Sequence, residues 1–238
     1  MLMSIDTLMK QPMQFDDNTL FVVDVCGTLF TEDTTLGLLR YHFDRVSDRR
    51  FRKLLFKACT THMSPIRFGF IALEFLSGKH WLKYAAVKLL NGDHLDSLHE
   101  SARLYAAHLI ATKKIPSIWR LLESSAPKKR ILLASASLEP VVASLAGKMG
   151  ARYVASQLEQ NDGILSGHYH VDITGSKAQA ILNKYGPAAL DGHVCAISDN
   201  FSDRALLENV GKAIVVLGKK HHQSRWPGMN ALFLNVDG

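Results

Sequence analysis

Five short apolar segments constrain the fold of this chain more than any other feature. Each is a run of four or five consecutive apolar residues without a charge: Leu20–Val23, 131–134, 194–197, 213–217 and 231–234. Strands covered on both faces of a parallel sheet have such continuous runs, whereas a strand with one wet face alternates apolar and polar residues. We therefore expect a parallel sheet that is buried on both faces.

Helical patterns between the later segments provide the layers that would cover this sheet. Ser137 is typical of a helix start, and Gly150 of the end of the same helix. Ser176 and Gly186 bound a second predicted helix, 177–185. Strands that alternate with helices predict an α/β fold with a three-layer core.

Residues 36–125 have a different pattern and no convincing strand. Apolar residues recur there at spacings of three and four, most clearly between 95 and 109. We expect an inserted, all-helical cap at 36–125, with residues 1–35 and 126–238 forming the core. The sequence Asn-Asp-Gly at 161–163 predicts a hairpin turn within that core.

Polar residues follow three of the predicted strands. Asp24 ends the first strand, Ser135 follows the second, and Asp199 follows the third. Because ligands bind beyond the carboxyl ends of the strands in open α/β sheets, we expect these side chains to line one site. With Lys177 at a helix start, the set suits displacement at phosphorus. A carboxylate attacks, Mg²⁺ offsets negative charge, and a lysine and a hydroxyl hold the transferring oxygens.

Four short motifs carry a resemblance to a known family. They are Asp-Val-Cys-Gly-Thr at 24–28, Ile-Leu-Leu-Ala-Ser at 131–135, Lys177, and Ser-Asp-Asn-Phe-Ser-Asp at 198–203. In this order they resemble the haloacid dehalogenase-like (HAD) superfamily, and Ser-Ala-Ser-Leu-Glu-Pro at 135–140 is similar to its phosphoserine-phosphatase-like branch. The resemblance covers nearly the whole chain. It implies a Rossmann-like core, a helical cap after the first motif, and a Mg²⁺-dependent hydrolase of phosphomonoesters.

The resemblance also implies roles for individual residues in phosphoryl transfer. Asp24 would be the nucleophile that becomes an aspartyl-phosphate, and Lys177 would bridge this nucleophile and the phosphate. Thr28 and Ser135 would bind the phosphate.

A magnesium site is implied in the same way. Asp24, the backbone carbonyl of Cys26, and Asp199 would hold the ion. Asp203 would be a further metal ligand or would orient Lys177.

The sequence departs from the family pattern at Cys26. Phosphatases of the superfamily usually carry a second Asp here, which protonates the leaving oxygen and then deprotonates the attacking water. A thiol with a reference pKa of about 8.5 is a weak acid at pH 7, and loss of a positioned acid/base costs roughly 10²–10⁴ in rate. The simplest interpretation of Cys26 itself is a small buried apolar residue rather than a reactive thiol.

Three alternatives for the function stay open. The protein is a phosphatase with weakened turnover, a dehalogenase or phosphonatase, or a catalytically impaired phosphate-binding or scaffold protein. The two Asp residues of the motif at 198–203 argue against a dehalogenase that works without a metal. A phosphonatase needs a Schiff-base lysine in the cap, which the sequence does not place.

Positive charge is concentrated in one part of the chain. Residues 36–130 hold 18 Lys and Arg against 7 Asp and Glu, whereas the rest holds 10 against 15. This excess is either a solvated helical surface or a surface that attracts anions. The basic and apolar helices of the cap also resemble the caps of branch members associated with lipid or lipid-linked phosphates. This resemblance implies that the substrate is a phosphorylated small molecule or a lipid-linked phosphate. The basic cap would then contact the inner face of a membrane peripherally.

Location and other partners follow from weaker features. Three scattered cysteines and an N-terminal segment without an apolar signal core predict a cytoplasmic protein. The basic stretch 219–222 is short and isolated, so we expect no nucleic-acid binding. The oligomeric state does not follow from the sequence.

Overall fold

The computed structural model describes residues 2–3, 15–16, 18–46, 50–61, 63–78, 80–126, 130–191, 193–218 and 223–236. The basic stretch 219–222 and most of the N-terminal segment lie outside the described residues, so the hypotheses about them stay predictions. No helix among the described residues combines the length and the apolar character that a membrane crossing requires.

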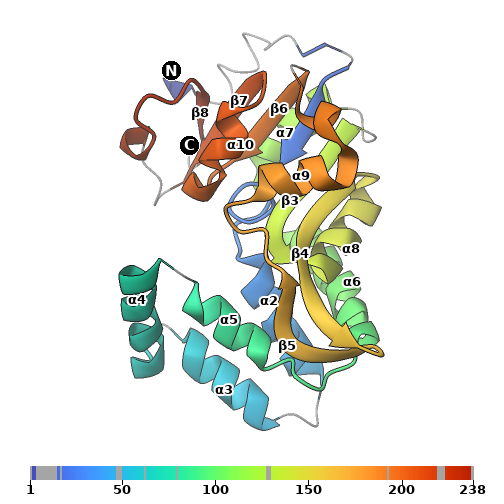
Figure 1. Ribbon diagram of the computed structural model, residues 1–238, viewed down its shortest axis with the longest axis vertical. Helices are drawn as coiled ribbons and strands as arrows, with labels where there is room; N and C mark the ends of the chain where they lie inside the picture. The colour runs from blue at the N-terminus through green and yellow to red at the C-terminus, as the bar shows by residue number, and fades with distance from the viewer. Residues whose placement is uncertain are drawn as a thin grey trace.

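Within the described residues, one eight-stranded sheet forms the centre of the molecule (Figure 1). Its strands lie in the order β1-β8-β7-β6-β2-β3-β4-β5, and neighbours pair in parallel except β4 and β5, which are antiparallel. The strands are β1 (Leu2–Met3), β2 (Leu20–Val23), β3 (Ile131–Leu138), β4 (Arg152–Asn161), β5 (Ile164–Val171), β6 (Val194–Ser198), β7 (Lys212–Leu217) and β8 (Leu232–Asn235). The five predicted strands correspond to β2, β3, β6, β7 and β8, which confirms the predicted parallel sheet.

The side chains of β2 explain why the sheet is buried on both faces. Phe21 and Val23 pack into one hydrophobic cluster, whereas Val22 packs into a second cluster, because successive side chains of a strand point to opposite faces. The first cluster includes side chains of α6 (Leu95–Thr112), α7 (Pro116–Ser125) and α8 (Glu139–Met149). The second includes side chains of α9 (Lys177–Tyr185) and α10 (Arg204–Glu208). The predicted three-layer α/β core is confirmed.

The segment between β2 and β3 is helical, as predicted. It begins with α2 (Thr34–Arg45), α3 (Arg50–Thr60), α4 (Pro65–Ser77) and α5 (Trp81–Lys88). Figure 1 shows α3, α4 and α5 at the end of the molecule away from β7 and β8. Helix α6 instead packs along α8, and both share the core cluster. The helical cap is confirmed as a region, while its limits at residues 36 and 125 stay a prediction.

Strands β4 and β5 form the predicted hairpin. Asp162 and Gly163, at its turn, both have positive φ, 49° and 78°. A two-residue turn with two positive φ angles matches the right-handed twist of the strands that it joins. The hairpin lies at the edge of the sheet beside β3, and Figure 1 shows it reaching from the core toward the helical cap.

The end of β3 differs from the prediction. The strand continues through Leu138, so Ser135 and Ser137 both lie on it. Leu138, not Ser137, is the N-cap of α8, and no side chain caps that helix. The predicted cap at Ser137 is therefore wrong, because the hydroxyl of Ser137 is engaged by Ser135 and Thr34 instead.

Candidate active site

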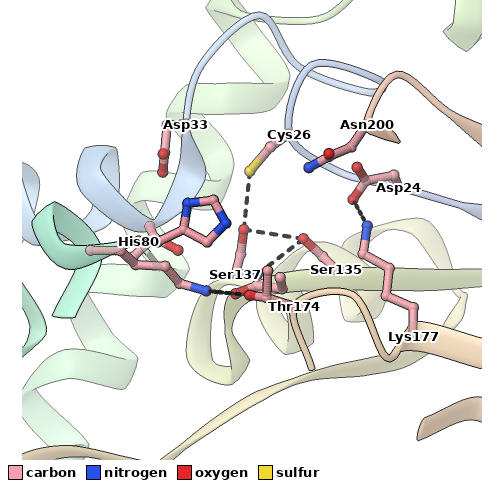
Figure 2. A pocket seen from close by; sticks show the side chains of 12 residues that line it. Asp24, Cys26, Asp33, His80, Ser135, Ser137, Thr174, Lys177 and Asn200 are labelled. Atoms are coloured by element: carbon pink, nitrogen blue, oxygen red, sulfur yellow. Dashed lines mark hydrogen bonds and ion pairs between the residues drawn. The ribbon is translucent and has the colours of Figure 1, made fainter. Parts of the chain in front are cut away.

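A pocket of about 140 Å³ lies where β2, β3 and β6 end (Figure 2). The core contributes Asp24, Cys26, Ser135, Ala136, Ser137, Thr174, Lys177 and Asn200. The start of α2 contributes Asp33 and Thr35, and the start of α5, in the predicted cap, contributes His80 and Lys83. The structure thus brings four of the predicted site residues, Asp24, Cys26, Ser135 and Lys177, to one pocket. Both the core and the cap region supply its walls.

Lys177 connects two carboxylates at the base of the site. Its Nζ lies 2.7 Å from Asp24 Oδ1 and 2.7 Å from Asp203 Oδ2, and all three side chains are buried. Burial lowers the pKa of the Lys177 ammonium, but attraction to Asp24 and Asp203 outweighs burial and raises the pKa above its ordinary value. Lys177 therefore stays a cation, and it holds Asp24 in place.

Asp24 is the carboxylate that faces the pocket. Its Oδ1 also accepts a hydrogen bond of 2.7 Å from the backbone N–H of Val25. Burial raises the pKa of Asp24 to about 7; Lys177 opposes this shift, and the neighbouring Asp203 and Asp199 add to it. Three buried carboxylates thus share one lysine, and the site carries more negative charge than its own cation offsets.

Asp199 packs against the glycine turn that follows Asp24. Gly27 has φ of +71°, and a Cβ at this position would lie 2.1 Å from Asp199 Oδ2. Only glycine fits this position, because an added Cβ would clash and because other residues rarely adopt this φ. The turn at Gly27 and the carboxylate of Asp199 are therefore in direct contact, and neither can shift without the other.

Thr28 fixes Asp199 from the other side. Its hydroxyl donates to Asp199 Oδ1 at 3.0 Å, and the backbone N–H of Asp199 lies 3.0 Å from the same hydroxyl oxygen. Thr28 is fully buried and does not line the pocket. Its predicted contact with phosphate stays a prediction, and what the structure contains is a hydroxyl that positions Asp199.

The donor set of this site fits Mg²⁺. Among the described residues, no group of three or more His, Cys, Asp and Glu side chains lies close enough to hold a metal by side chains alone. The predicted set does not need such a group, because it combines two carboxylates, Asp24 and Asp199, with the backbone carbonyl of Cys26, and Mg²⁺ usually keeps several waters. Burial also raises the pKa of Asp199, to about 6. Hard oxygen donors and uncompensated negative charge are what a divalent cation requires.

Asp203 is engaged with the core rather than with the pocket. Its Oδ2 accepts from Lys177 Nζ and, at 2.6 Å, from the hydroxyl of Ser198. Its Oδ1 is buried and has no hydrogen-bond partner among the described residues. Of the two predicted roles, these contacts support the one in which Asp203 orients Lys177.

Cys26 does not lie in apolar surroundings, contrary to the simplest interpretation of the sequence. Its Sγ is 3.0 Å from Thr34 Oγ1 and 3.0 Å from Ser137 Oγ, and the backbone N–H of Thr34 donates to it at 3.3 Å. Burial raises the pKa of the thiol to about 12, and Asp33 and Asp24 add to the shift. Cys26 is thus a neutral thiol that lines the pocket beside the hydroxyl of Ser137 (Figure 2).

Ser135 belongs to this group of hydroxyls. It is 1% exposed. Its Oγ donates to Ser137 Oγ at 3.1 Å and accepts from the backbone N–H of Ser137 at 3.2 Å. Ser137 in turn lies 2.6 Å from Thr34 Oγ1. The hydrogen-bonded chain Ser135–Ser137–Thr34 runs from the core to the start of α2. The sequence pattern did not predict Ser137 or Thr34 as site residues.

Lys83 is the main pocket residue that the sequence did not predict. Its Nζ donates to the backbone carbonyl of Ala136 at 2.8 Å and to Thr174 Oγ1 at 3.1 Å, and it pairs with Asp172 Oδ1 at 3.4 Å. Burial lowers the pKa of Lys83, although Asp172 opposes the shift. These contacts join α5 to the core beside the pocket. No local sequence pattern around residue 83 predicts these contacts, because all three partners come from distant segments.

The fold and the site together define a class of protein: a three-layer α/β protein with an acidic site at the carboxyl edge of a parallel sheet and a helical cap beside it. The chain belongs to the haloacid dehalogenase-like hydrolases, because the sequence model of that family matches residues 21–208. The four motifs of the sequence analysis fall within these residues. No curated protein sequence matches the chain significantly.

Solved structures share this fold at low sequence identity. A protein of unknown function from Bordetella pertussis Tohama I is 15% identical with a TM-score of 0.67, covering 91% of this chain and 98% of that one. A phosphoserine phosphatase, solved as a phospho-aspartyl intermediate analogue, is 14% identical with a TM-score of 0.53, covering 90% and 92%. A HAD family hydrolase from Salmonella enterica serovar Typhi is 13% identical with a TM-score of 0.55, covering 86% of this chain. This chain spans 64% of the length of that hydrolase.

Proposed function

We propose that this protein hydrolyses phosphomonoesters through an aspartyl-phosphate on Asp24. The observation that carries the proposal is the placement of Asp24 at the pocket, held 2.7 Å from the buried Lys177, in a member of the HAD-like hydrolases. The substrate class is a phosphorylated small molecule or a lipid-linked phosphate, and the location is cytoplasmic. The phospho-aspartyl analogue of the similar phosphoserine phosphatase supports the same chemistry.

The reaction has two displacements at phosphorus. In the first, a carboxylate oxygen of Asp24 forms a bond to phosphorus while the bond to the leaving oxygen breaks and that oxygen takes up a proton. In the second, water attacks the phosphorus, inorganic phosphate leaves, and the carboxylate of Asp24 is regenerated. Lys177 offsets the negative charge that the nucleophile and the phosphoryl group share, and Ser135, which lines the pocket, would bind a phosphoryl oxygen.

Asp24, Asp199 and the carbonyl of Cys26 would hold Mg²⁺, which supplies further positive charge to the phosphoryl oxygens when it is bound. The proton of the leaving group has no strong acid at the usual position, because Cys26 is a weakly acidic thiol. We therefore expect turnover to depend strongly on the leaving group. Aryl and acyl phosphates, whose leaving oxygens are weak bases, should react faster than alkyl phosphates.

The test is the substitution Asp24→Asn with p-nitrophenyl phosphate as substrate. An amide is a poor nucleophile, so activity should fall to background while the fold is retained. The exposed Asp191, which lies outside the pocket, provides the matched control, and Asp191→Asn should keep full activity. Acid quenching during turnover, followed by mass spectrometry of the peptide with Asp24, should detect the phosphorylated residue in the wild-type protein alone. Full turnover in Asp24→Asn would contradict the proposal.

Lys83 supports a second candidate, cleavage of a carbon–phosphorus bond. It is a cap lysine in the pocket, and burial lowers its pKa. Its neutral amine would condense with an aldehyde carried by the phosphonate to form an imine, and the aldehyde oxygen would leave as water. The carbon–phosphorus bond would then break as phosphorus passes to Asp24, and the bonding electrons would enter the imine as an enamine. Borohydride trapping of Lys83 with an aldehyde-bearing phosphonate, absent in Lys83→Ala, would favour this candidate over the phosphatase.

A further inference from the structure

Helix α4 is apolar yet contributes no buried residue to the protein. Of the thirteen large apolar side chains that are exposed among the described residues, ten lie between Phe51 and Trp81. We define the α3–α4 surface by the most exposed of them: Phe51, Leu54, Met63, Phe68, Phe75 and Leu76. Phe75 and Leu76 are 87% and 81% exposed. Clusters of exposed large apolar side chains commonly mark surfaces that bind a protein partner or a membrane.

The same segment is strongly basic. Residues 50–88 hold eight Arg and Lys and a single acidic residue, Glu74. The carboxylate of Glu74 is turned inward, where its Oε1 accepts a hydrogen bond of 3.0 Å from the backbone N–H of Leu82. Arg50 and Lys57 of α3 are exposed. Lys53 of the same helix is paired with Asp44 at 2.6 Å. The α3–α4 surface therefore presents apolar side chains beside the exposed cations Arg50 and Lys57.

We propose that the α3–α4 surface docks on a bilayer of anionic phospholipid. A short helix with exposed aromatic and aliphatic side chains next to Lys and Arg lies in the plane of the interface, with its apolar side chains at the acyl boundary and its cations at the headgroups. At 13 residues, α4 is too short to cross the bilayer. A second copy of the chain is disfavoured as the occupant, because pairing two such surfaces would bring like charges together.

Docking at this surface would also position the active site. Helix α5 is the next element of the chain after α4, and His80 and Lys83 line the pocket. The wall of the pocket that comes from the cap thus belongs to the same stretch of chain as the docking helix. The docking itself does not rest on the proposed phosphatase chemistry, and it is measured without turnover.

Sedimentation of the full chain with vesicles tests the proposal. Wild-type protein should bind phosphatidylglycerol–phosphatidylcholine vesicles, and binding to pure phosphatidylcholine should be much weaker. The double variant Phe75→Asp/Leu76→Asp should lower the partition coefficient at least about tenfold. Lys57→Glu should lower it about fivefold or more. The matched controls Ile164→Asp and Lys148→Glu lie outside the surface and should bind like the wild type.

Folding of each variant is checked by circular dichroism, and it should be unchanged because Phe75 and Leu76 contact little of the core. High salt should weaken the binding, since it screens the attraction to headgroups. Asp24→Asn should bind vesicles like the wild type. Failure of the proposed catalytic function and failure of the proposed membrane docking are therefore seen in separate measurements. Equal, negligible sedimentation with both vesicle types would overturn the proposal. So would a concentration-dependent dimer in sedimentation velocity that Phe75→Asp/Leu76→Asp abolishes.

Discussion

Replacing Lys177 by Met tests how much the buried ion group contributes to the fold. Lys177 is 4% exposed, and its Nζ lies 2.7 Å from both Asp24 and Asp203. Met has a similar length and an apolar end, so the volume is nearly kept while the charge is removed. The substitution leaves two buried carboxylates without their cation.

The cost follows from that uncompensated charge. Removing one partner of a buried ion pair typically destabilises a protein by about 3–5 kcal/mol. For a chain of this size, 1 kcal/mol shifts the Tm by about 2–4 °C. We therefore expect the Tm of Lys177→Met to fall by about 6–20 °C.

Thermal melts followed by circular dichroism measure this shift. Lys184→Met is the matched control, because Lys184 is an exposed lysine on the same helix, and its Tm should change by less than about 2 °C. Adding Asp203→Asn to Lys177→Met should restore roughly half of the lost stability, since it removes one unpaired charge that is coupled to the other. A Tm for Lys177→Met within about 2 °C of the wild type would refute the argument from buried charge.

Three further predictions concern the turn and the metal site. Cys26→Asp should speed hydrolysis of alkyl phosphates more than of aryl phosphates, by up to roughly 10²–10⁴, in steady-state assays on both substrates; no gain on either would contradict the compromised-acid hypothesis. Asp199→Ala should raise the Mg²⁺ concentration needed for half-maximal activity by at least about tenfold, and an unchanged midpoint would exclude Asp199 as a ligand. Gly27→Ala should cost about 1–3 kcal/mol of stability in denaturant unfolding and should weaken Mg²⁺ binding, because its Cβ displaces Asp199; a variant with wild-type values would argue against the close packing of this turn.

Local patterns in the sequence were sufficient for the framework of the fold. β2 is a run of apolar residues whose side chains enter clusters on both faces of the sheet, and continuous apolar runs report that kind of burial directly. The turn at Asp162 and Gly163 was predictable because residues that tolerate positive φ are few. The pocket residues Asp24, Ser135 and Lys177 were predictable because the carboxyl ends of parallel strands meet at one edge.

The surroundings of individual side chains were decided only by the tertiary structure. Cys26 reads as a small apolar residue in the sequence, yet it lies among the hydroxyls of Thr34 and Ser137, eight and 111 positions away. Lys83 is one of many lysines in a basic segment, and the segments that carry Ala136 and Asp172 bring it to the pocket. Apolar periodicity and turn residues act over a few neighbouring positions, so the local sequence is enough to recognise them. A hydrogen bond or an ion pair between distant segments depends on where these segments meet. That meeting point is set only when the sheet and its helices pack together.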